Sequence, residues 1–185
     1  MTFQETSIHG AYLIRLDPHV DDRGSFSRAW CAQEFAGAGL AFHPVQLNVA
    51  TSQVRGTLRG LHYQVAPFEE AKLMRCVQGA IFDVLADVRA ESETYGRWFG
   101  VELTADAQRM LYVPEGVAHG YMTLVDHVQV SYLASGGYEP QAERGVRWDD
   151  PFFGIDWPQV GPLVISDKDR SWGNFDSRAG ADGQP

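Results

Sequence analysis

A histidine, two arginines and a lysine fall within residues 56–79, in sequence that otherwise resembles β-strands. They are Arg59, His62, Lys72 and Arg75. Guanidinium and ammonium groups bind anions, and a neutral imidazole beside a cation is suited to take up a proton near neutral pH. The segment therefore indicates anion binding combined with proton transfer, although His62 by its position alone is better explained as a structural histidine of a core.

Arg59 and His62 can serve one site only if their strand is irregular. Side chains alternate between the two faces of a strand, so a regular strand over residues 57–64 would put these two residues on opposite faces. Gly60 stands between them. A glycine at such a position permits a β-bulge, and we expect a bulge here to re-aim one of the two side chains.

The charge distribution favours a small anionic ligand over a nucleic acid. The net charge is −9, which argues against a nucleic-acid surface. Between residues 23 and 75, however, basic residues outnumber acidic ones: Arg23, Arg28, Arg55, Arg59, Lys72 and Arg75 against Glu34, Glu69 and Glu70. The local excess suits a phosphate, unless the arginines are scattered over solvated faces. The two lysines of the chain are Lys72 and Lys168.

Length and composition predict a single globular domain over residues 1–185. Hydrophobic residues make up 44% and charged residues 21%, which is ordinary for globular proteins. No run of about 18 apolar residues predicts a membrane span, and the N-terminal residues do not resemble a signal peptide. The two cysteines, Cys31 and Cys76, are far apart. We therefore expect a reducing, cytoplasmic setting with no disulfide and no cysteine-based zinc site.

Short apolar or alternating segments separated by glycine-rich turns predict an all-β sandwich or barrel. The expected strands are 8–16, 45–50, 57–64, 73–77, 80–89, 97–103, 109–113, 119–124 and 128–133. Residues 31–39 are the best helix candidate, because Gly39 can end a helix. The tail after about residue 172 is expected to be loop-like.

Residues 112–121 contain the pattern Pro-x-Gly-x-x-His, which occurs in the second motif of cupins, small β-barrels that often bind metal. A three-ligand histidine or glutamate site would need a His-x-His pair in the first motif. The matching stretch, residues 62–64, has His62 alone, so only His62 and His119 stand as ligands. We expect no metal site, which leaves His119 for another role or as a polar turn residue.

Two further residues are candidates for proton transfer. Tyr132 shares a strand face with Val128 and Val130, which is typical of a core aromatic but also aims a phenol into a barrel. Asp169 lies in the charged run 167–169. A carboxylate there can pair with a histidine and fix its tautomer, and a solvated turn is the simpler interpretation.

Together these pieces resemble the dTDP-4-dehydrorhamnose 3,5-epimerase family over about residues 8–172. The motifs that carry the resemblance are Arg23-Gly24, Arg59 to Gln64, Lys72-Leu73, Arg75-Cys76, Phe82 to Val84, Val113 to Gly116, Ala118 to Gly120, Glu143 to Gly145, Arg147 to Pro151, and Ser166 with Lys168-Asp169. The resemblance implies an all-β, cupin-like double-stranded β-helix (jelly roll) with short peripheral helices. It also implies a homodimer that uses no metal and no cofactor. From the net charge and the lack of a long apolar run, we expect neither a nucleic acid nor a membrane as partner.

The chemistry that the resemblance implies is inversion of C3 and/or C5 of a 4-keto-6-deoxy nucleotide sugar, from dTDP-4-dehydro-6-deoxyglucose to dTDP-4-dehydrorhamnose. His62 matches the base, Asp169 the carboxylate that orients it, Tyr132 the proton donor and Lys72 the cation near the developing enolate. The positions that match contacts to the nucleotide-diphosphate sugar are Arg23, Arg28, Gln46, Asn48, Arg59, His119, Tyr138, Glu143 and Lys168.

Two positions depart from the family pattern. Arg28 stands where the family usually has a nucleotide-binding glutamate, and Leu47 where it often has aspartate, which leaves the nucleotide base and the hexose open. A relative that inverts C3 or C5 alone shares the same catalytic residues. A ketoisomerase on a nucleotide sugar is an alternative that shares the β-barrel and a histidine base. A non-catalytic cupin-like sugar-binding module is another, against which the joint presence of a base, an acid and a carboxylate argues, and a metal-dependent cupin ranks last.

Overall fold

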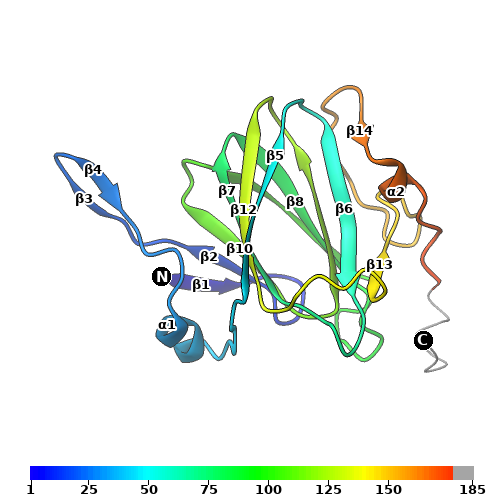
Figure 1. The fold of residues 1–185 in the computed structure, drawn as a ribbon, viewed down its shortest axis with the longest axis horizontal. Coiled ribbons are helices and arrows are strands. Elements are labelled where there is room, and N and C mark those ends of the chain that lie inside the picture. The colour runs from blue at the N-terminus through cyan, green and yellow to red at the C-terminus, as the bar shows by residue number, and fades with distance from the viewer. Residues whose placement is uncertain (177–185) are drawn as a thin grey trace.

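Within residues 1–176, which the computed structural model describes, twelve of the fourteen strands form two sheets, and two short helices lie at the periphery (Figure 1). The first sheet comprises β1 (Thr2–Glu5), β2 (Tyr12–Arg15), β5 (Gln46–Ser52), β7 (Lys72–Gln78), β10 (Arg109–Val113) and β12 (Val128–Ala134). The second comprises β6 (Thr57–Gln64), β8 (Ala80–Asp87), β9 (Trp98–Thr104), β11 (Val117–Thr123), β13 (Glu143–Gly145) and β14 (Val164–Ile165). The separate hairpin β3 (His19–Asp21) and β4 (Gly24–Phe26) and the helices α1 (Ala32–Gly37) and α2 (Asp167–Arg170) complete the elements.

The strand order crosses repeatedly between the sheets. The first sheet runs β1-β2-β10-β7-β12-β5, and the second runs β13-β6-β11-β8-β9, with β14 parallel to β6. Strands that follow each other in sequence therefore often lie in different sheets. This is the double-stranded β-helix, or jelly roll, that the family resemblance implies.

Strand β8 is central because both of its faces carry buried apolar side chains. Ile81 and Leu85 point into the core between the sheets, whereas Val84 and Ala86 pack on the other side in a cluster that includes Trp157. All four are fully buried. Burying an aliphatic side chain of the size of valine or leucine contributes about 1.5–3 kcal/mol, so this strand stabilises both layers at once.

The strand and helix predictions hold for most elements. The predicted strand over 8–16 is wrong at its start, because Gly10 has φ +78° and the Ala11 N–H donates to the Ile8 carbonyl (3.0 Å), which makes a turn. Strand β1 was not predicted, since its short, mostly exposed sequence carries little apolar pattern. The predicted helix over 31–39 is α1, which is shorter by one residue at its start and two at its end.

A buried ion pair closes the turn after β8. Asp87, fully buried, accepts hydrogen bonds from Arg89 (2.8 and 2.9 Å), Ser92 (2.6 Å) and Thr94 (2.6 Å). Burial acts to raise the pKa of Asp87, but these hydrogen bonds outweigh it and lower the pKa below its usual value. The carboxylate therefore stabilises this turn while it is charged.

The last described residues, 173–176, have no regular structure, as expected for a loop-like tail. The rest of that predicted tail lies outside the described residues. Among residues 1–176, no helix is long and apolar enough to cross a membrane.

Candidate active site

A cavity of about 490 Å³ opens between the two sheets. Its walls come from β5, β7 and β12 on one side and from β6, β11 and the α2 segment on the other. A second hollow of about 400 Å³ adjoins it and shares His62, Lys72, Tyr132 and Lys168 with it. The two hollows together bring most of the residues predicted from the sequence to one place.

The expected bulge at Gly60 is present and puts Arg59 and His62 in the same cavity. His62 pairs with His119 of β11, but Arg59 pairs with Tyr121, so β6 has one residue more than β11 between these pairs. Gly60 has φ +116°, and a Cβ there would lie 2.6 Å from the Gly120 Cα. Glycine is therefore required at this position, and the bulge lets Arg59 and His62 line one cavity, as predicted.

His62 and Asp169 form a hydrogen-bonded pair across 107 positions of sequence. The His62 Nε2 lies 2.6 Å from the Asp169 Oδ1, and the Gly60 N–H donates to the Asp169 Oδ2 at 3.2 Å. Ser166, the N-cap residue of α2, accepts from the Asp169 N–H and so fixes the helix that carries the carboxylate. Because a carboxylate only accepts, Nε2 carries the hydrogen and the lone pair is on Nδ1.

The same contacts keep Asp169 ionised. Asp169 is buried, and burial alone would raise its pKa. The hydrogen bonds from His62 and Gly60, together with the contact with Ser166, outweigh this and lower the pKa of Asp169. A charged carboxylate in this position stabilises an imidazolium, so the pair suits a base that gains a proton.

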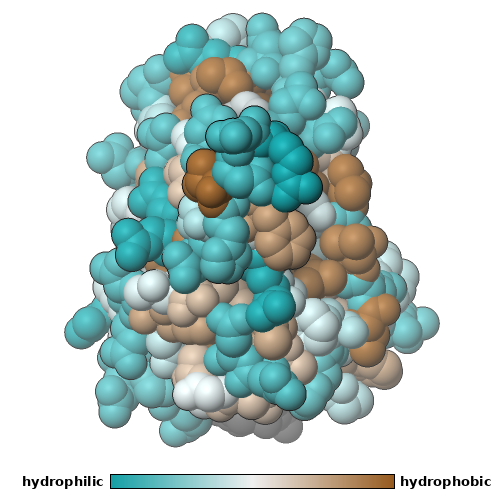
Figure 2. Space-filling view, turned by 90° about the vertical axis from the view of Figure 1, so that its left-hand side faces the viewer, coloured by the Kyte–Doolittle hydropathy of each residue, from teal (hydrophilic) through white to brown (hydrophobic). Residues whose placement is uncertain are grey.

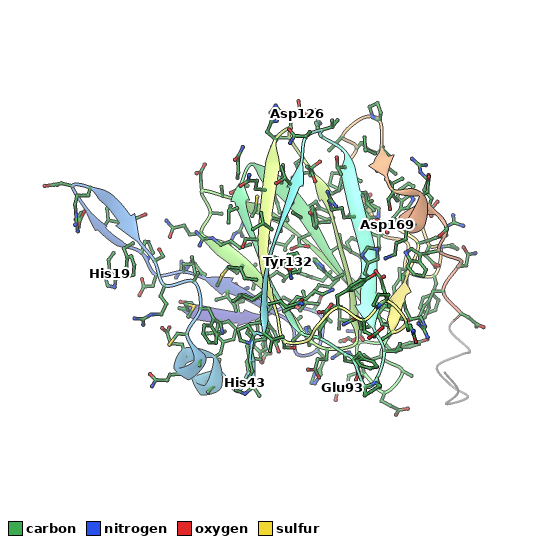
Figure 3. All side chains as sticks on the ribbon, viewed as in Figure 1. His19, His43, Glu93, Asp126, Tyr132 and Asp169 are labelled. Atoms are coloured by element: carbon green, nitrogen blue, oxygen red, sulfur yellow. The ribbon has the colours of Figure 1, made fainter. Side chains whose placement is uncertain are left out.

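Tyr132 lies in the cavity on the sheet opposite His62. It belongs to β12 and is near the middle of the barrel, while Asp169 lies at the side where α2 packs (Figure 3). Burial is the largest cause that raises the pKa of Tyr132, the charge of Glu70 adds to it, and Arg59 partly opposes it. Tyr132 is therefore a protonated phenol at neutral pH and has a proton to donate.

Lys72 and His119 also line the cavity, each with an acidic partner that sequence reasoning did not identify. The Lys72 Nζ lies 3.1 Å from the Glu70 Oε1. The His119 Nε2 lies 2.5 Å from the Asp83 Oδ1, and both side chains are buried. His119 is thus a strand residue of β11 and does not lie in a turn.

Predicted ligand residues gather at the outer hollow. Gln46 and Asn48 of β5 line it together with Tyr138, Glu143 and Lys168. The Tyr138 hydroxyl donates to the Glu143 carboxylate (2.7 Å), and Lys168 forms an ion pair with the same carboxylate. The contact with Glu143 raises the pKa of Lys168, so this lysine stays charged at the rim.

Arg23 and Arg28 do not reach either hollow within one chain. Arg23 is in the β3–β4 hairpin, which projects away from the barrel, and its side chain is 90% exposed and paired with Asp21 (Figure 1). Arg28 lies 3.3 Å from Glu34 of α1. Within one chain, therefore, the structure does not bring these two arginines to the predicted nucleotide site.

No group of three or more histidine, cysteine, aspartate or glutamate side chains within residues 1–176 is arranged to hold a metal ion. His62 and His119, the two candidate ligands, each bind a carboxylate instead. The site thus offers two histidine–aspartate pairs, a phenol and several cations around one cavity.

Comparison with known proteins agrees with the resemblance seen in the motifs. The family model described as dTDP-4-dehydrorhamnose 3,5-epimerase matches residues 5–177. The chain belongs to this family. A curated family member from Sinorhizobium fredii is 44% identical over 175 residues, covering 92% of this chain and 88% of the relative.

Solved structures of the family show the same fold. The dTDP-4-dehydrorhamnose 3,5-epimerase from Bacillus anthracis with TDP and PPi bound has a TM-score of 0.90 and 39% identity, covering 94% of this chain and 99% of that one. A 3'-monoepimerase from Streptomyces bikiniensis in complex with dTDP-quinovose has a TM-score of 0.85 and 38% identity, covering 91% and 85%. Proteins named as two-centre and as one-centre epimerases are therefore similar to this chain to about the same degree.

Proposed function

We propose that this protein is a cofactor-independent isomerase that inverts C3 and C5 of dTDP-4-dehydro-6-deoxyglucose, giving dTDP-4-dehydrorhamnose. The observation that carries the proposal is the His62–Asp169 pair and the Tyr132 phenol in one cavity, on opposite sheets. Membership of the epimerase family supports it. Binding alone does not require a base, its orienting carboxylate and an acid together.

In the proposed mechanism, the C4 ketone makes the hydrogens on C3 and C5 acidic. The His62 Nδ1 takes one of these protons, and the electron pair of the broken C–H bond moves toward the ketone oxygen to give an enolate. Lys72 and Arg59 supply positive charge for that oxygen. Tyr132 then returns a proton to the same carbon from the other wall, which inverts the centre.

The balance of protons closes through solvent. After one inversion His62 carries an extra proton and Tyr132 lacks one, and exchange with water restores both. Asp169 stays ionised throughout and stabilises the imidazolium. Each inversion in deuterated buffer therefore places deuterium on the inverted carbon.

The outer hollow would hold the nucleotide diphosphate. It carries Lys168, Gln46 and Asn48, and Tyr138 offers an exposed ring for a base to stack on. Arg23 and Arg28 join this site in the proposal through a second copy of the chain. The homodimer has support in exposed apolar side chains: Val45, which directly precedes the edge strand β5, Leu47 and Val49 of β5, and the apolar residues of the projecting hairpin.

The polar surface is broken by apolar residues on the side from which the hairpin projects (Figure 2). Light scattering of the purified protein is expected to give twice the mass of one chain. An Arg23→Ala variant is expected to bind dTDP more weakly without loss of thermal stability, because the side chain is exposed in one chain. A monomer with full activity would remove the second-copy part of the proposal.

We further propose that residues 1–185 form one domain. The two separate cysteines favour a cytoplasmic protein.

The decisive test is NMR of dTDP-4-dehydro-6-deoxyglucose with the protein in deuterated buffer. The expected product carries deuterium at C3 and C5, and His62→Ala is expected to abolish both exchanges. Deuterium at C3 alone or C5 alone would identify a one-centre epimerase, the second candidate that the likeness to the 3'-monoepimerase supports. A shifted carbonyl would identify a ketoisomerase, and binding without deuterium uptake a sugar-binding module.

A further inference from the structure

Glu70 has no part in the reaction as described so far, yet its carboxylate is inside the site. It lines the outer hollow together with Lys72 and Tyr132. Its side chain is 10% exposed, and its Oε1 lies 3.1 Å from the Lys72 Nζ. Its neighbour Glu69, by contrast, is exposed to solvent. Burying a carboxylate costs free energy unless the carboxylate is paired, so the position of Glu70 beside Lys72 indicates a role for this pair.

The fold fixes the backbone of Glu70 to the end of β12. The Ala71 N–H donates to the Ser135 Oγ (2.8 Å), and the Ser135 N–H donates to the Ala71 carbonyl (3.0 Å). Gly136 packs so closely that a Cβ there would lie 3.2 Å from the Glu70 Cβ. The carboxylate thus starts from a fixed point next to the strand that carries Tyr132, while Lys72 opens β7 immediately afterwards.

Titratable groups face Tyr132 from all walls of the site but one. The exception is β5, whose lining residues are Gln46, Asn48 and Ala50. The titratable groups on the other walls, besides Glu70 and Lys72, are Arg59, His62 and Tyr63 of β6, His119 and Tyr121 of β11, and Lys168 and Asp169 of α2. Farther out, Glu143 and Tyr138 are bound to each other and to Lys168. Asp169 and Glu143 are each engaged by a basic side chain, namely His62 and Lys168.

We propose that Glu70 is a positioning residue of the active site, which holds the Lys72 ammonium in the cavity and supplies negative charge on the Tyr132 side of it. The effect of Glu70 on kcat rests on the proposed function, whereas its effect on the ionisation of Tyr132 does not. With the carboxylate in place, Lys72 is held between its partner and the enolate oxygen. The same charge disfavours the Tyr132 phenolate, which agrees with the direction in which Glu70 moves the pKa of Tyr132.

Replacement of the charge without loss of shape separates this role from simple packing. Glu70→Gln keeps the size of the side chain and removes its charge, Glu70→Asp keeps the charge, and Glu69→Gln is the matched exposed control. Tyrosine labelled with ¹³C at Cζ reports ionisation, and the Tyr132 signal is assigned by its absence in Tyr132→Phe. We expect Tyr132 to ionise at lower pH in Glu70→Gln, and near the wild-type pH in Glu70→Asp and Glu69→Gln.

An unchanged Tyr132 titration in folded Glu70→Gln would overturn the electrostatic part, whether or not the protein is an epimerase. For the positioning part, kcat for deuterium exchange is expected to fall about tenfold in Glu70→Gln with KM within about twofold of wild type. The same substitution in a Lys72→Met background is expected to cost less than about twofold, because the group it positions is gone. Equal losses in both backgrounds would overturn it. Absence of exchange in the wild type would instead refute the proposed function.

Discussion

Asp169→Asn tests the central pair, because its effect on proton positions can be worked out from the contacts. The Gly60 N–H donates to one Asp169 oxygen at 3.2 Å, and His62 binds the other at 2.6 Å. An asparagine must keep its single oxygen toward the Gly60 N–H, so its NH₂ group faces the His62 Nε2. That nitrogen then accepts a hydrogen bond, and the imidazole hydrogen moves to Nδ1.

The variant thus blocks the nitrogen that has to take the proton and removes the charge that stabilises the imidazolium. General base catalysis typically supplies 10²–10⁴-fold, and we expect kcat to fall about 10³-fold, or ~4 kcal/mol in the barrier. The fold keeps both hydrogen bonds, so the melting temperature is expected to stay within about 4 °C of wild type. Deuterium exchange into the substrate, followed by NMR, measures the rate.

The matched control is Asp167→Asn, which changes an exposed aspartate of the same short helix. It is expected to keep full activity. If Asp169→Asn retains more than about a tenth of the wild-type rate while folded, the carboxylate does not set the histidine tautomer, and the mechanism fails.

Three other substitutions follow from the structure. Gly60→Ala adds a Cβ at φ +116° against the β11 backbone, and its free energy of unfolding is expected to drop by ~3 kcal/mol or more, measured by denaturant titration. Asp87→Asn leaves Arg89 without its charged partner, and is expected to destabilise by about 3 kcal/mol at pH 7. The pKa of Asp87 is lowered in the fold, so the difference in free energy of unfolding between wild type and Asp87→Asn is greatest above the usual aspartate pKa range. The difference is expected to shrink as the pH falls through the lowered pKa, and a difference that stays constant would contradict the pairing. Tyr132→Phe is expected to lower net inversion by about 10²-fold or more while exchange at one carbon survives better, and undiminished inversion would remove Tyr132 as the acid.

The sequence predicted those parts of the fold that local pattern determines. Strand β10 was predicted with its observed bounds, because apolar and polar residues mark its ends clearly. The bulge at Gly60 was expected, since two functional side chains three positions apart need it to share a face. The short β1 was missed, because its pairing with β2 supplies the order that its own sequence does not specify.

The parts of the site that were not predicted depend on contacts across strands. Asp83 lies in one of the motifs that carry the family resemblance, but its contact with His119 follows from the register of β8 against β11, which no sequence pattern shows. Glu70 is two positions before Lys72, and a carboxylate so close to a candidate catalytic lysine was a signal that could have been used. The place of Arg23 outside the cavity depends on how the hairpin leaves the barrel, which is set by its lack of pairing with the two large sheets in the described part of the chain.

The separation of His62 and Asp169 along the chain has a consequence for the synthesis of the protein. The histidine is made first and the carboxylate 107 residues later, after the fourteen strands of the described part of the chain. A nascent chain can therefore form most of its strands while the His62 imidazole still lacks its carboxylate partner. Truncation by a premature stop codon before α2 would remove Lys168 and Asp169 from the cavity wall and is expected to abolish epimerase activity.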